Sequence, residues 1–326
     1  MKLTKIYQTR IENEIKTLFS TSEEPPNLYD PAKYVLSLGG KRIRPILCMT
    51  GCALFNRDAV ENAVSPAVGL EIFHNFTLLH DDLMDKSEKR RNHPTVHKKW
   101  NDNIAILSGD AMLVMAYRQI SKAPENVLSS VLEVFNQTAI EVCEGQQFDM
   151  DFETRDDVSV IEYLEMIRLK TAVLLGGSLK IGAIIGGANQ EETQTIYHFG
   201  SSAGISFQIQ DDWLDVYGDS SEFGKPIGGD IVCNKKTFLL ITALNDLPEI
   251  SQKELLKWLH KKEFDRDKKI SAIKNLYEEA KVSKKAQEKM NFYYSISLKR
   301  LEELKGDGEI LDELAEFANN LIIRSK

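Results

Sequence analysis

Residues 80–85 read HDDLMD and residues 210–215 read QDDWLD, so the spacing Asp-Asp-x-x-Asp occurs twice in the chain. Each copy lies in an otherwise apolar stretch with helical periodicity. On a helix, residues four apart lie on the same face, so the first and last aspartates of each motif stack beside one another. Such like-charged pairs destabilise a helix by a few tenths of a kcal/mol. Their repetition therefore indicates that a cation lies between the carboxylates.

The kind of cation follows from the oxygen ligands. Hard divalent ions, above all Mg²⁺, prefer carboxylate and water oxygens and often take a phosphate as a further ligand. Two carboxylate clusters facing one cavity would form a site for a magnesium-chelated diphosphate. Neither cluster fits the EF-hand calcium loop, which excludes a simple calcium-binding helical protein. The predicted metal ligands are Asp81, Asp82, Asp85, Asp211, Asp212 and Asp215.

Composition limits the class of protein. Of 326 residues, 42% are hydrophobic, which is enough for a sizeable core, and the net charge of −8 argues against nucleic acid as a partner. The four cysteines form no CxxC pair, which fits a reducing cytoplasm. The charged N-terminus does not resemble a signal peptide. The apolar stretch 171–188 is interrupted by Lys180 and rich in glycine, so we expect a buried helix pair and no transmembrane segment.

Nearly every segment shows helical periodicity, and strand signals are almost absent. We therefore expect an all-α fold in which residues 1–326 form a single domain, a helical bundle. A helix is predicted to begin at Asp30-Pro31 and to end at Gly39-Gly40, with the next starting near Arg42. Further helices are predicted over residues 1–19, 58–85, 103–122, 124–150, 159–187 and 190–217, followed by Lys/Glu-rich helices after about 247.

Cations and glycines accompany both aspartate motifs. The sequence GGKRIRP at 39–45 opens a helix, and such glycine-rich helix starts bind anions, although the Walker spacing is missing. Arg90-Arg91 follows the first motif, and FGKPIGGD (223–230) with Lys235 follows the second. Taken alone, these segments are equally typical of solvated loops. Lys170 interrupts an apolar helix, where a lysine needs an anionic partner. His74 precedes Asp81 by two turns, and a lone helical histidine is more often structural than a ligand.

The ordered set GGKRIRP, LLHDDLMD with RR, GQQFD, LKTA, FQIQDDWLD and FGKPIGGD with NKKT resembles the trans-isoprenyl diphosphate synthases of the polyprenyl synthetase family. The resemblance is strong over residues 35–240. It implies an all-helical bundle around a deep central cavity, usually a homodimer. The reaction it implies is the condensation of isopentenyl diphosphate with an allylic diphosphate (dimethylallyl, geranyl or farnesyl). It also implies three Mg²⁺ ions held by the two aspartate motifs, with Mn²⁺ as the alternative metal.

The resemblance also assigns the cations. Residues contacting the allylic diphosphate would be Arg90, Lys170, Gln208, Lys225 and Lys235. The pocket for isopentenyl diphosphate would be formed by Lys41, Arg44, His74 and Arg91. Thr171 matches a residue beside the reacting carbons, and Gln146 and Asp149 match residues that support the metal ligands.

The chemistry requires these residue types. The allylic C–O bond must ionise, and Mg²⁺ with Lys and Arg would neutralise the diphosphate as it leaves. The double bond of isopentenyl diphosphate then attacks the cation and a proton is lost, for which the departed diphosphate is a plausible base. This reaction needs no Ser or Cys nucleophile.

The product tail is expected to run along the helix carrying Asp81, where one turn, about 5.4 Å, is close to one isoprene unit. Phe76 matches the family position that stops chain growth, and the small Thr77 beside it relaxes that stop. The pair predicts a C20 or C15 product, with C20 favoured. Further residues that line the tail or simply pack the core are Phe73, Met112, Met115 and Ala116.

Two other functions fit parts of the pattern. A class I terpene cyclase shares the first motif, but its second motif differs from DDxxD and it needs no GGKRIRP site. A non-catalytic subunit of a heteromeric synthase would be expected to lack one aspartate motif or the isopentenyl cations, and all are present here.

Overall fold

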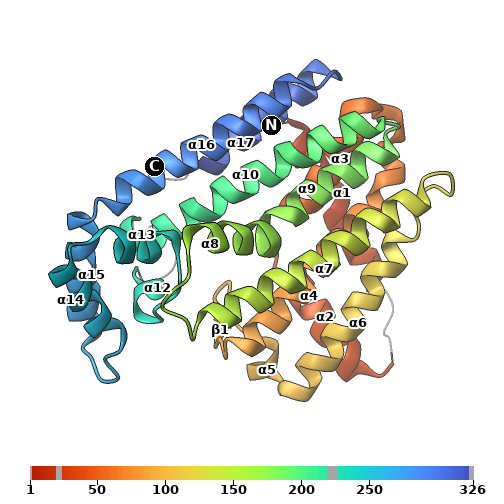
Figure 1. Cartoon of the computed structure of the whole chain (residues 1–326). Helices are drawn as coiled ribbons and strands as arrows, with labels where there is room; N and C mark the ends of the chain where they lie inside the picture. Colours follow the sequence, from red (N-terminus) through yellow and green to blue (C-terminus); the bar gives the residue numbers. More distant parts are fainter. Residues whose placement is uncertain (1, 20–23, 219–226, 323–326) are drawn as a thin grey trace. The chain divides into compact units, whose positions relative to one another are not determined.

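The computed structural model describes residues 2–19, 24–218 and 227–322. Its contacts divide the chain into two compact units: unit 1 comprises 1–137, 177–196 and 305–313, and unit 2 comprises 138–176, 197–304 and 314–326. The predicted all-α class is confirmed, since helices dominate the described residues (Figure 1). That the whole chain forms one domain stays a prediction.

Unit 1 is centred on the helix that carries the first aspartate motif. α4 packs against α3 and α6, and α2 packs against α6. α4 and α6 leave room only for glycine at two points: a Cβ at Gly109 would overlap the ring of His80, and a Cβ at Gly69 would lie 2.9 Å from the carbonyl of Ala116. The elements of this unit are α1 (Lys2–Leu18), α2 (Pro26–Ser37), α3 (Ile43–Phe55), η1 (Arg57–Ala59), α4 (Val60–Met84), β1 (Lys89–Arg90), β2 (His93–Pro94), α5 (Val96–Lys99) and α6 (Asp102–Ile120).

Unit 2 holds the second aspartate motif and a core of apolar side chains from α8, α13 and the C-terminal helices. Side-chain caps define several helix starts here: Ser159 and Glu162 form a capping box, and Asp265 accepts from the N–H of Lys268. Its elements are α8 (Val160–Ile167), η2 (Arg168–Ala172), α12 (Gly229–Val232), α13 (Phe238–Asp246), α14 (Glu249–Leu259), α15 (Arg266–Glu279) and α16 (Val282–Glu302). Four helices have residues assigned to both units: α7 (Leu128–Phe152), α9 (Val173–Ile185), α10 (Gln190–Tyr217) and α17 (Gly308–Ile322).

Most predicted helices are confirmed within a few residues, but the start of α2 is wrong. The helix begins at Pro26 and runs through Pro31, which was expected at its first position. Proline removes the N–H that would bond to the carbonyl four residues earlier. That carbonyl, on Asn27, instead accepts a hydrogen bond from the hydroxyl of Ser108 on α6 at 3.4 Å. A contact distant in sequence therefore makes the internal proline tolerable.

The predicted helix 159–187 is also not uniform. Residues Arg168–Ala172 form a π-helical turn, η2, between α8 and α9. Such turns insert one residue into a helix and are frequent at functional sites. In addition, β1 and β2 form a two-residue antiparallel hairpin that the sequence pattern did not predict. Within the described ranges, no helix combines the length and apolar character needed to cross a membrane.

Candidate active site

The first aspartate motif lies at the C-terminal end of α4, and its three carboxylates are not equivalent. Asp82 is buried, with 5% of its surface exposed, and its Oδ2 accepts a hydrogen bond from Nε of Arg90 at 2.8 Å. A second nitrogen of Arg90 lies 3.5 Å from Oδ2 of Asp81. Asp81 is partly exposed, and Asp85 is exposed. The middle aspartate thus faces the protein, while the i, i+4 pair faces outward.

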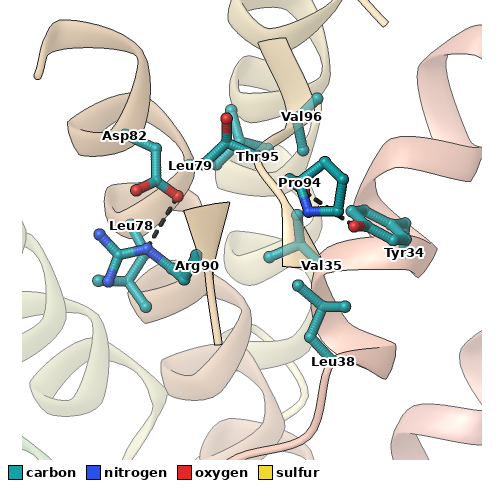
Figure 2. Close-up of a pocket in the computed structure, with 10 residues that line it drawn as sticks. All are labelled: Tyr34, Val35, Leu38, Leu78, Leu79, Asp82, Arg90, Pro94, Thr95 and Val96. Atoms are coloured by element: carbon teal, nitrogen blue, oxygen red, sulfur yellow. Dashed lines mark hydrogen bonds and ion pairs between the residues drawn. The ribbon is translucent and has the colours of Figure 1, made fainter. Parts of the chain in front are cut away.

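A short hairpin holds Arg90 in place. In β1, Arg90 pairs with His93 of β2, and the next strand residue, Pro94, accepts a hydrogen bond from the hydroxyl of Tyr34 at 2.8 Å. Figure 2 shows Arg90 and Asp82 at one side of a small pocket, with Tyr34 and Pro94 at the other. The pocket is otherwise mostly apolar and has room for about one water molecule. The Asp82–Arg90 pair is therefore largely removed from water.

Burial raises the pKa of the Asp82 carboxyl, and the hydrogen bond from Arg90 only partly offsets this. Its Oδ1 is buried and has no hydrogen-bond partner among the described residues. A carboxylate oxygen without a hydrogen-bond partner, close to other carboxylates, could coordinate a hard cation such as Mg²⁺ or accept a hydrogen bond from a ligand. Across the described ranges, no three acidic, histidine or cysteine side chains are arranged to hold a metal by themselves. Mg²⁺ commonly binds to one or two carboxylates and completes its shell with waters and phosphate oxygens.

Three of the four residues predicted to bind isopentenyl diphosphate come together in unit 1. Nη1 of Arg44 lies 3.1 Å from Nε2 of His74, and Nη1 of Arg91 donates to the carbonyl of Gly39. Burial lowers the pKa of His74 well below its usual range, and the charges of Arg44 and Arg91 lower it further. The neutral ring can therefore accept from Arg44 through Nε2 and carry its proton on Nδ1. The predicted fourth member, Lys41, is exposed.

The positive charge of this cluster is poorly balanced. Burial lowers the pKa of Arg44 to about 10, the carboxylate of Glu71 opposes this shift, and the charge of Arg91 adds to it. Nε of Arg44 is buried without a hydrogen-bond partner among the described residues. Buried donors and cations without a matching anion indicate a place for an anionic ligand.

Arg42, from the same GGKRIRP sequence, has a different role that the sequence analysis missed. It is buried, donates to Glu12 at 2.8 Å and Glu71 at 2.7 Å, and reaches the carbonyl of Leu36 at 2.6 Å. Glu71 also accepts from the side-chain amide of Asn75 at 2.9 Å. Arg42 thus connects α1, α2 and α4 at the start of α3. A glutamate inside an otherwise apolar helix, at position 71, was the signal that a buried cation would be its partner.

The second aspartate motif, on α10, has the same inward middle residue with different partners. Asp212 is 3% exposed; its Oδ2 accepts from the hydroxyl of Tyr163 at 2.6 Å and its Oδ1 accepts from the amide of Gln208 at 3.1 Å. Burial raises the pKa of Asp212, and the nearby charge of Lys235 partly offsets burial. The sequence analysis predicted Gln208 and Lys235 but missed Tyr163, since nothing in the sequence near residue 163 marks it.

Lys235 stands between two carboxylates. Its Nζ lies 3.9 Å from Oδ1 of Asp212 and 3.8 Å from Oδ1 of Asp230. Burial would lower the pKa of this lysine, but the carboxylates of Asp212 and Asp230 outweigh burial, so its pKa lies above the usual value and it stays charged. The backbone N–H of Asp230 donates to Oδ2 of Asp215 at 2.9 Å. The loop after α10 therefore returns to the motif.

The π-helical turn η2 contributes two further predicted residues. Nζ of Lys170 donates to Oδ2 of Asp149 at 2.6 Å, which gives this lysine the anionic partner that its apolar helix required. The hydroxyl of Thr171 donates to Oε1 of Gln208 at 3.1 Å. A chain of hydrogen bonds thus runs from Thr171 through Gln208 to Asp212. Gln146 is partly buried on α7.

The predicted chain-length residues lie one to two turns before Asp81. The half-buried ring of Phe76 lies 4.8 Å from that of His80 and 5.7 Å from that of Phe73, measured between centroids. The hydroxyl of Thr77 donates to the carbonyl of His74 at 2.8 Å. Phe73, Met112 and Ala116 are buried, and Met115 is partly buried. Lys225 lies outside the described residues, so its assignment stays a prediction.

Comparisons with known proteins show which family the chain resembles as a whole. The profile described as polyprenyl synthetase matches residues 25–279. A short chain isoprenyl diphosphate synthase of Methanocaldococcus jannaschii is 40% identical over 268 residues, which are 82% of this chain and 80% of that one. A crystal structure of a geranylgeranyl pyrophosphate synthase superposes with a TM-score of 0.93 at 42% identity and covers 99% of both chains.

The chain therefore belongs to the polyprenyl synthetase family, and it is a prenyltransferase enzyme. A more distant relative is the geranylgeranyl pyrophosphate synthase of Corynebacterium glutamicum, solved in complex with isoprenyl diphosphate and magnesium. It is 25% identical, has a TM-score of 0.87, and covers 99% of both chains.

Proposed function

We propose that this enzyme condenses isopentenyl diphosphate with an allylic diphosphate (dimethylallyl, geranyl or farnesyl) in a Mg²⁺-dependent reaction. The product would be a short-chain trans-prenyl diphosphate of C20 or C15, with C20 favoured. Its place of action would be the cytoplasm.

The observation that carries the proposal is the cluster around His74. The arginines that lower its pKa are, in order of effect, Arg44, Arg91, Arg90 and Arg42. Loss of hydration lowers the pKa values of Arg44 and Arg91, and neighbouring arginines lower them further, although the side chain of Arg91 is exposed. An anionic ligand would relieve this repulsion. Arg90 acts on His74 and also pairs with Asp82 of the first aspartate motif. This arrangement would suit one diphosphate substrate held by the arginines, beside a second diphosphate bound through metal ions.

Metal binding would fall to the carboxylates. The outward pairs Asp81 with Asp85 and Asp211 with Asp215 have the oxygen chemistry that Mg²⁺ prefers, and we propose three ions, with Mn²⁺ as a substitute. The unpartnered Oδ1 of Asp82 supports this fit. Bound Mg²⁺ would supply positive charge that stabilises the diphosphate as it leaves.

The side chains of this chain would do the rest. Arg90, Lys170 and Lys235 would hold the allylic diphosphate, and each already lies against a carboxylate that fixes its position. The pocket of Arg44, His74 and Arg91, with Lys41, would orient isopentenyl diphosphate so that its double bond meets the allylic carbon. Fixed charges aimed at the developing diphosphate contribute without reorganisation during the reaction.

The direct test is incubation with isopentenyl diphosphate and each allylic primer, followed by chromatography of the dephosphorylated products. A C20 or C15 alcohol that disappears when excess chelator is added supports the proposal. Hydrocarbon products from an allylic diphosphate alone would instead indicate a terpene cyclase. Absence of product with every primer would indicate a non-catalytic subunit.

Product length is tested at Phe76. Replacing it by alanine removes the aromatic ring that packs against Phe73 and His80, so the Phe76→Ala enzyme should release products at least one isoprene unit longer. Asn62→Ala, at an exposed residue near the start of the same helix, is the control and should leave the product length unchanged. If Phe76→Ala makes the same product as the wild type, the end of the tail lies elsewhere.

A homodimer forms part of the proposal. Two apolar residues one helical heptad apart on α6, Leu107 and Val114, are each 60% exposed, and Ile106 beside them is 47% exposed. Such a stripe suits a second copy of the chain. Sedimentation should give twice the monomer mass, and Leu107→Glu should shift it toward the monomer, whereas a monomeric wild type would refute the assignment.

A further inference from the structure

The turn that presents Lys235 to the second aspartate motif has little structure of its own. It runs over residues 227–236 and contains only the four-residue helix α12. Gly228 and Asn234, at its two ends, both have positive φ angles, +79° and +56°. Asparagine enters the left-handed region more readily than most residues with a side chain, but extended and right-handed conformations stay open to it. The turn therefore needs support from elsewhere to keep one conformation.

Contacts with Asp215 join the first part of this turn to the motif. The N–H of Gly228 donates to the backbone carbonyl of Asp215 at 2.7 Å, and the N–H of Asp230 donates to its carboxylate at 2.9 Å. Among the described residues, the backbone of the second part, which carries Lys235, makes no hydrogen bond to α10. The N–H of Lys235 instead donates to the carbonyl of Asp230 at 3.0 Å, within the turn. What orients Lys235 must therefore act on residues 232–234.

Helix α15 supplies that support from its first two turns. A guanidinium nitrogen of Arg266 donates to the carbonyl of Ile227 at 2.9 Å. Ile270 packs against Gly228, where any Cβ would lie 2.8 Å from its Cδ1 atom. Nζ of Lys269 donates to the carbonyl of Val232 at 3.1 Å and to Oδ1 of Asn234 at 2.7 Å. One face of α15 thus contacts both ends of the turn.

Lys269 is an unusual residue for a purely structural contact. Its side chain is fully buried at 0% exposure, and its Nζ lies 4.1 Å from the ring centroid of Phe264. Burial lowers its pKa, although the residue stays a donor to two oxygens. The oxygens that accept from it among the described residues are a backbone carbonyl and an amide oxygen, not carboxylates. A buried lysine whose partners are the backbone and side chain of one turn is placed to fix that turn.

We propose that Lys269 is a positioning residue that holds Asn234 in its left-handed conformation and so sets the position of Lys235 against Asp212 and Asp230. This inference rests on the proposed function only in assigning Lys235 to the allylic diphosphate. Binding of isopentenyl diphosphate is assigned to residues of unit 1, so it should be unaffected by a change at Lys269.

The test compares Lys269→Met with Lys268→Met. Methionine keeps the length of the side chain in the apolar surroundings but donates no hydrogen bond, and Lys268 is the exposed neighbour on the same helix. Amide hydrogen exchange of residues 228–236 is measured by mass spectrometry, and KM is measured for each substrate. Lys269→Met should speed exchange in this segment and raise KM for the allylic diphosphate on the order of tenfold, with KM for isopentenyl diphosphate unchanged. Lys268→Met should change neither.

A second variant acts on the other partner of the contact. Asn234→Gly keeps the left-handed backbone accessible but removes the acceptor of Lys269. If both residues act through one contact, the double variant should raise KM for the allylic diphosphate no more than Lys269→Met does. Faster exchange with unchanged allylic KM, or an equal rise in both KM values, would overturn the positioning role. If the wild type makes no prenyl product, the proposed function fails, but unchanged exchange in Lys269→Met would separately refute the contact.

Discussion

The two aspartate motifs have the same spacing but compensate their buried carboxylate in different ways. In both, the middle aspartate points inward: Asp82 is 5% exposed and Asp212 is 3% exposed. Asp82 pairs with a cation, Arg90, at 2.8 Å. Asp212 instead accepts from neutral donors, Tyr163 and Gln208, and its cation Lys235 stands 3.9 Å away.

This difference separates what the motif determines from what its surroundings determine. The side chains of successive helical residues point in directions about 100° apart. When the first and fifth residues of the motif face outward, the second residue therefore faces the protein, and this holds in both copies. The identity of the inward partner is not encoded in the motif. We infer that the outward aspartates act mainly on the ligand, whereas the inward ones also fix the shape of the site through their protein partners, and the following predictions test that division.

The largest effect is expected at the outward positions. Asp81→Asn and Asp211→Asn each remove a proposed metal ligand, so kcat should fall about 10²–10³-fold, as when one group stabilising a developing charge is lost. Steady-state assays over a range of Mg²⁺ concentrations check this result. Asp110→Asn, an exposed aspartate on α6, is the matched control and should retain full activity. Normal turnover in either outward variant would end the assignment of that motif.

The next effect concerns the cation of the first motif. Arg90→Met leaves Asp82 as a buried carboxylate without its counter-ion, so the free energy of unfolding should fall by about 3 kcal/mol. Urea denaturation in the presence of chelator measures this loss without a contribution from bound metal. Lys89→Met changes the exposed neighbouring residue and should lower the free energy of unfolding by less than about 0.5 kcal/mol. Similar losses in the two variants would show that the pair does not stabilise the fold.

A smaller loss is expected in the second motif. Tyr163→Phe removes one neutral hydrogen-bond donor to Asp212 and keeps the packing of the ring. The free energy of unfolding, measured in the same way, should therefore fall by about 2 kcal/mol. Gln208 and Lys235 remain to interact with the carboxylate, which is why the loss stays below that of Arg90→Met. A larger loss for Tyr163→Phe than for Arg90→Met would reverse the comparison between the motifs.

The smallest effect is a pH dependence. Burial raises the pKa of Asp212 to about 7 in the folded protein, against about 3.9 in an unfolded chain. A raised pKa means that stability is fully present below pH 4 and is lost as pH rises through 7. In chelator, the wild type should therefore lose about 1 kcal/mol relative to Asp212→Asn over the single pH unit from 4 to 5. Asp82→Asn should show a shallower difference, since Arg90 favours the charged form of Asp82. Parallel pH profiles for the wild type and Asp212→Asn would contradict the effect.

Much of the fold was predictable because local rules govern it. The break at Gly39-Gly40 and the helix 190–217 follow from residues within a few positions of each feature. The start of α2 was mispredicted because the hydroxyl that accommodates Pro31 comes from Ser108, 81 residues from its acceptor Asn27. No window of sequence contains that information.

The candidate site divides in the same way. The aspartates and the need of Lys170 for an anionic partner were predicted from residue type and spacing, whereas the roles of Arg44 and His74 were predicted from the resemblance to the family. Tyr163 and Lys269 were not predicted, because a tyrosine and a lysine on amphipathic helices are ordinary in sequence, and only the fold brings one to Asp212 and the other to Asn234. Residues that touch ligands leave a pattern in the sequence, whereas residues that orient them are recognised through distant contacts.

The π-helical turn η2 has a consequence for changes in chain length. Because it carries one residue more than an α-helical turn, it offsets the side-chain directions of α8 from those of α9 by about 100°. Tyr163 on α8 can therefore reach Asp212 while Gly176 on α9 lies against the carbonyl of Tyr197, where a Cβ would be only 2.7 Å away. Deleting a single residue between 168 and 172 would give a regular helix but rotate one of these contacts out of register. Between residues 168 and 172, insertions and deletions should therefore be tolerated less well than substitutions.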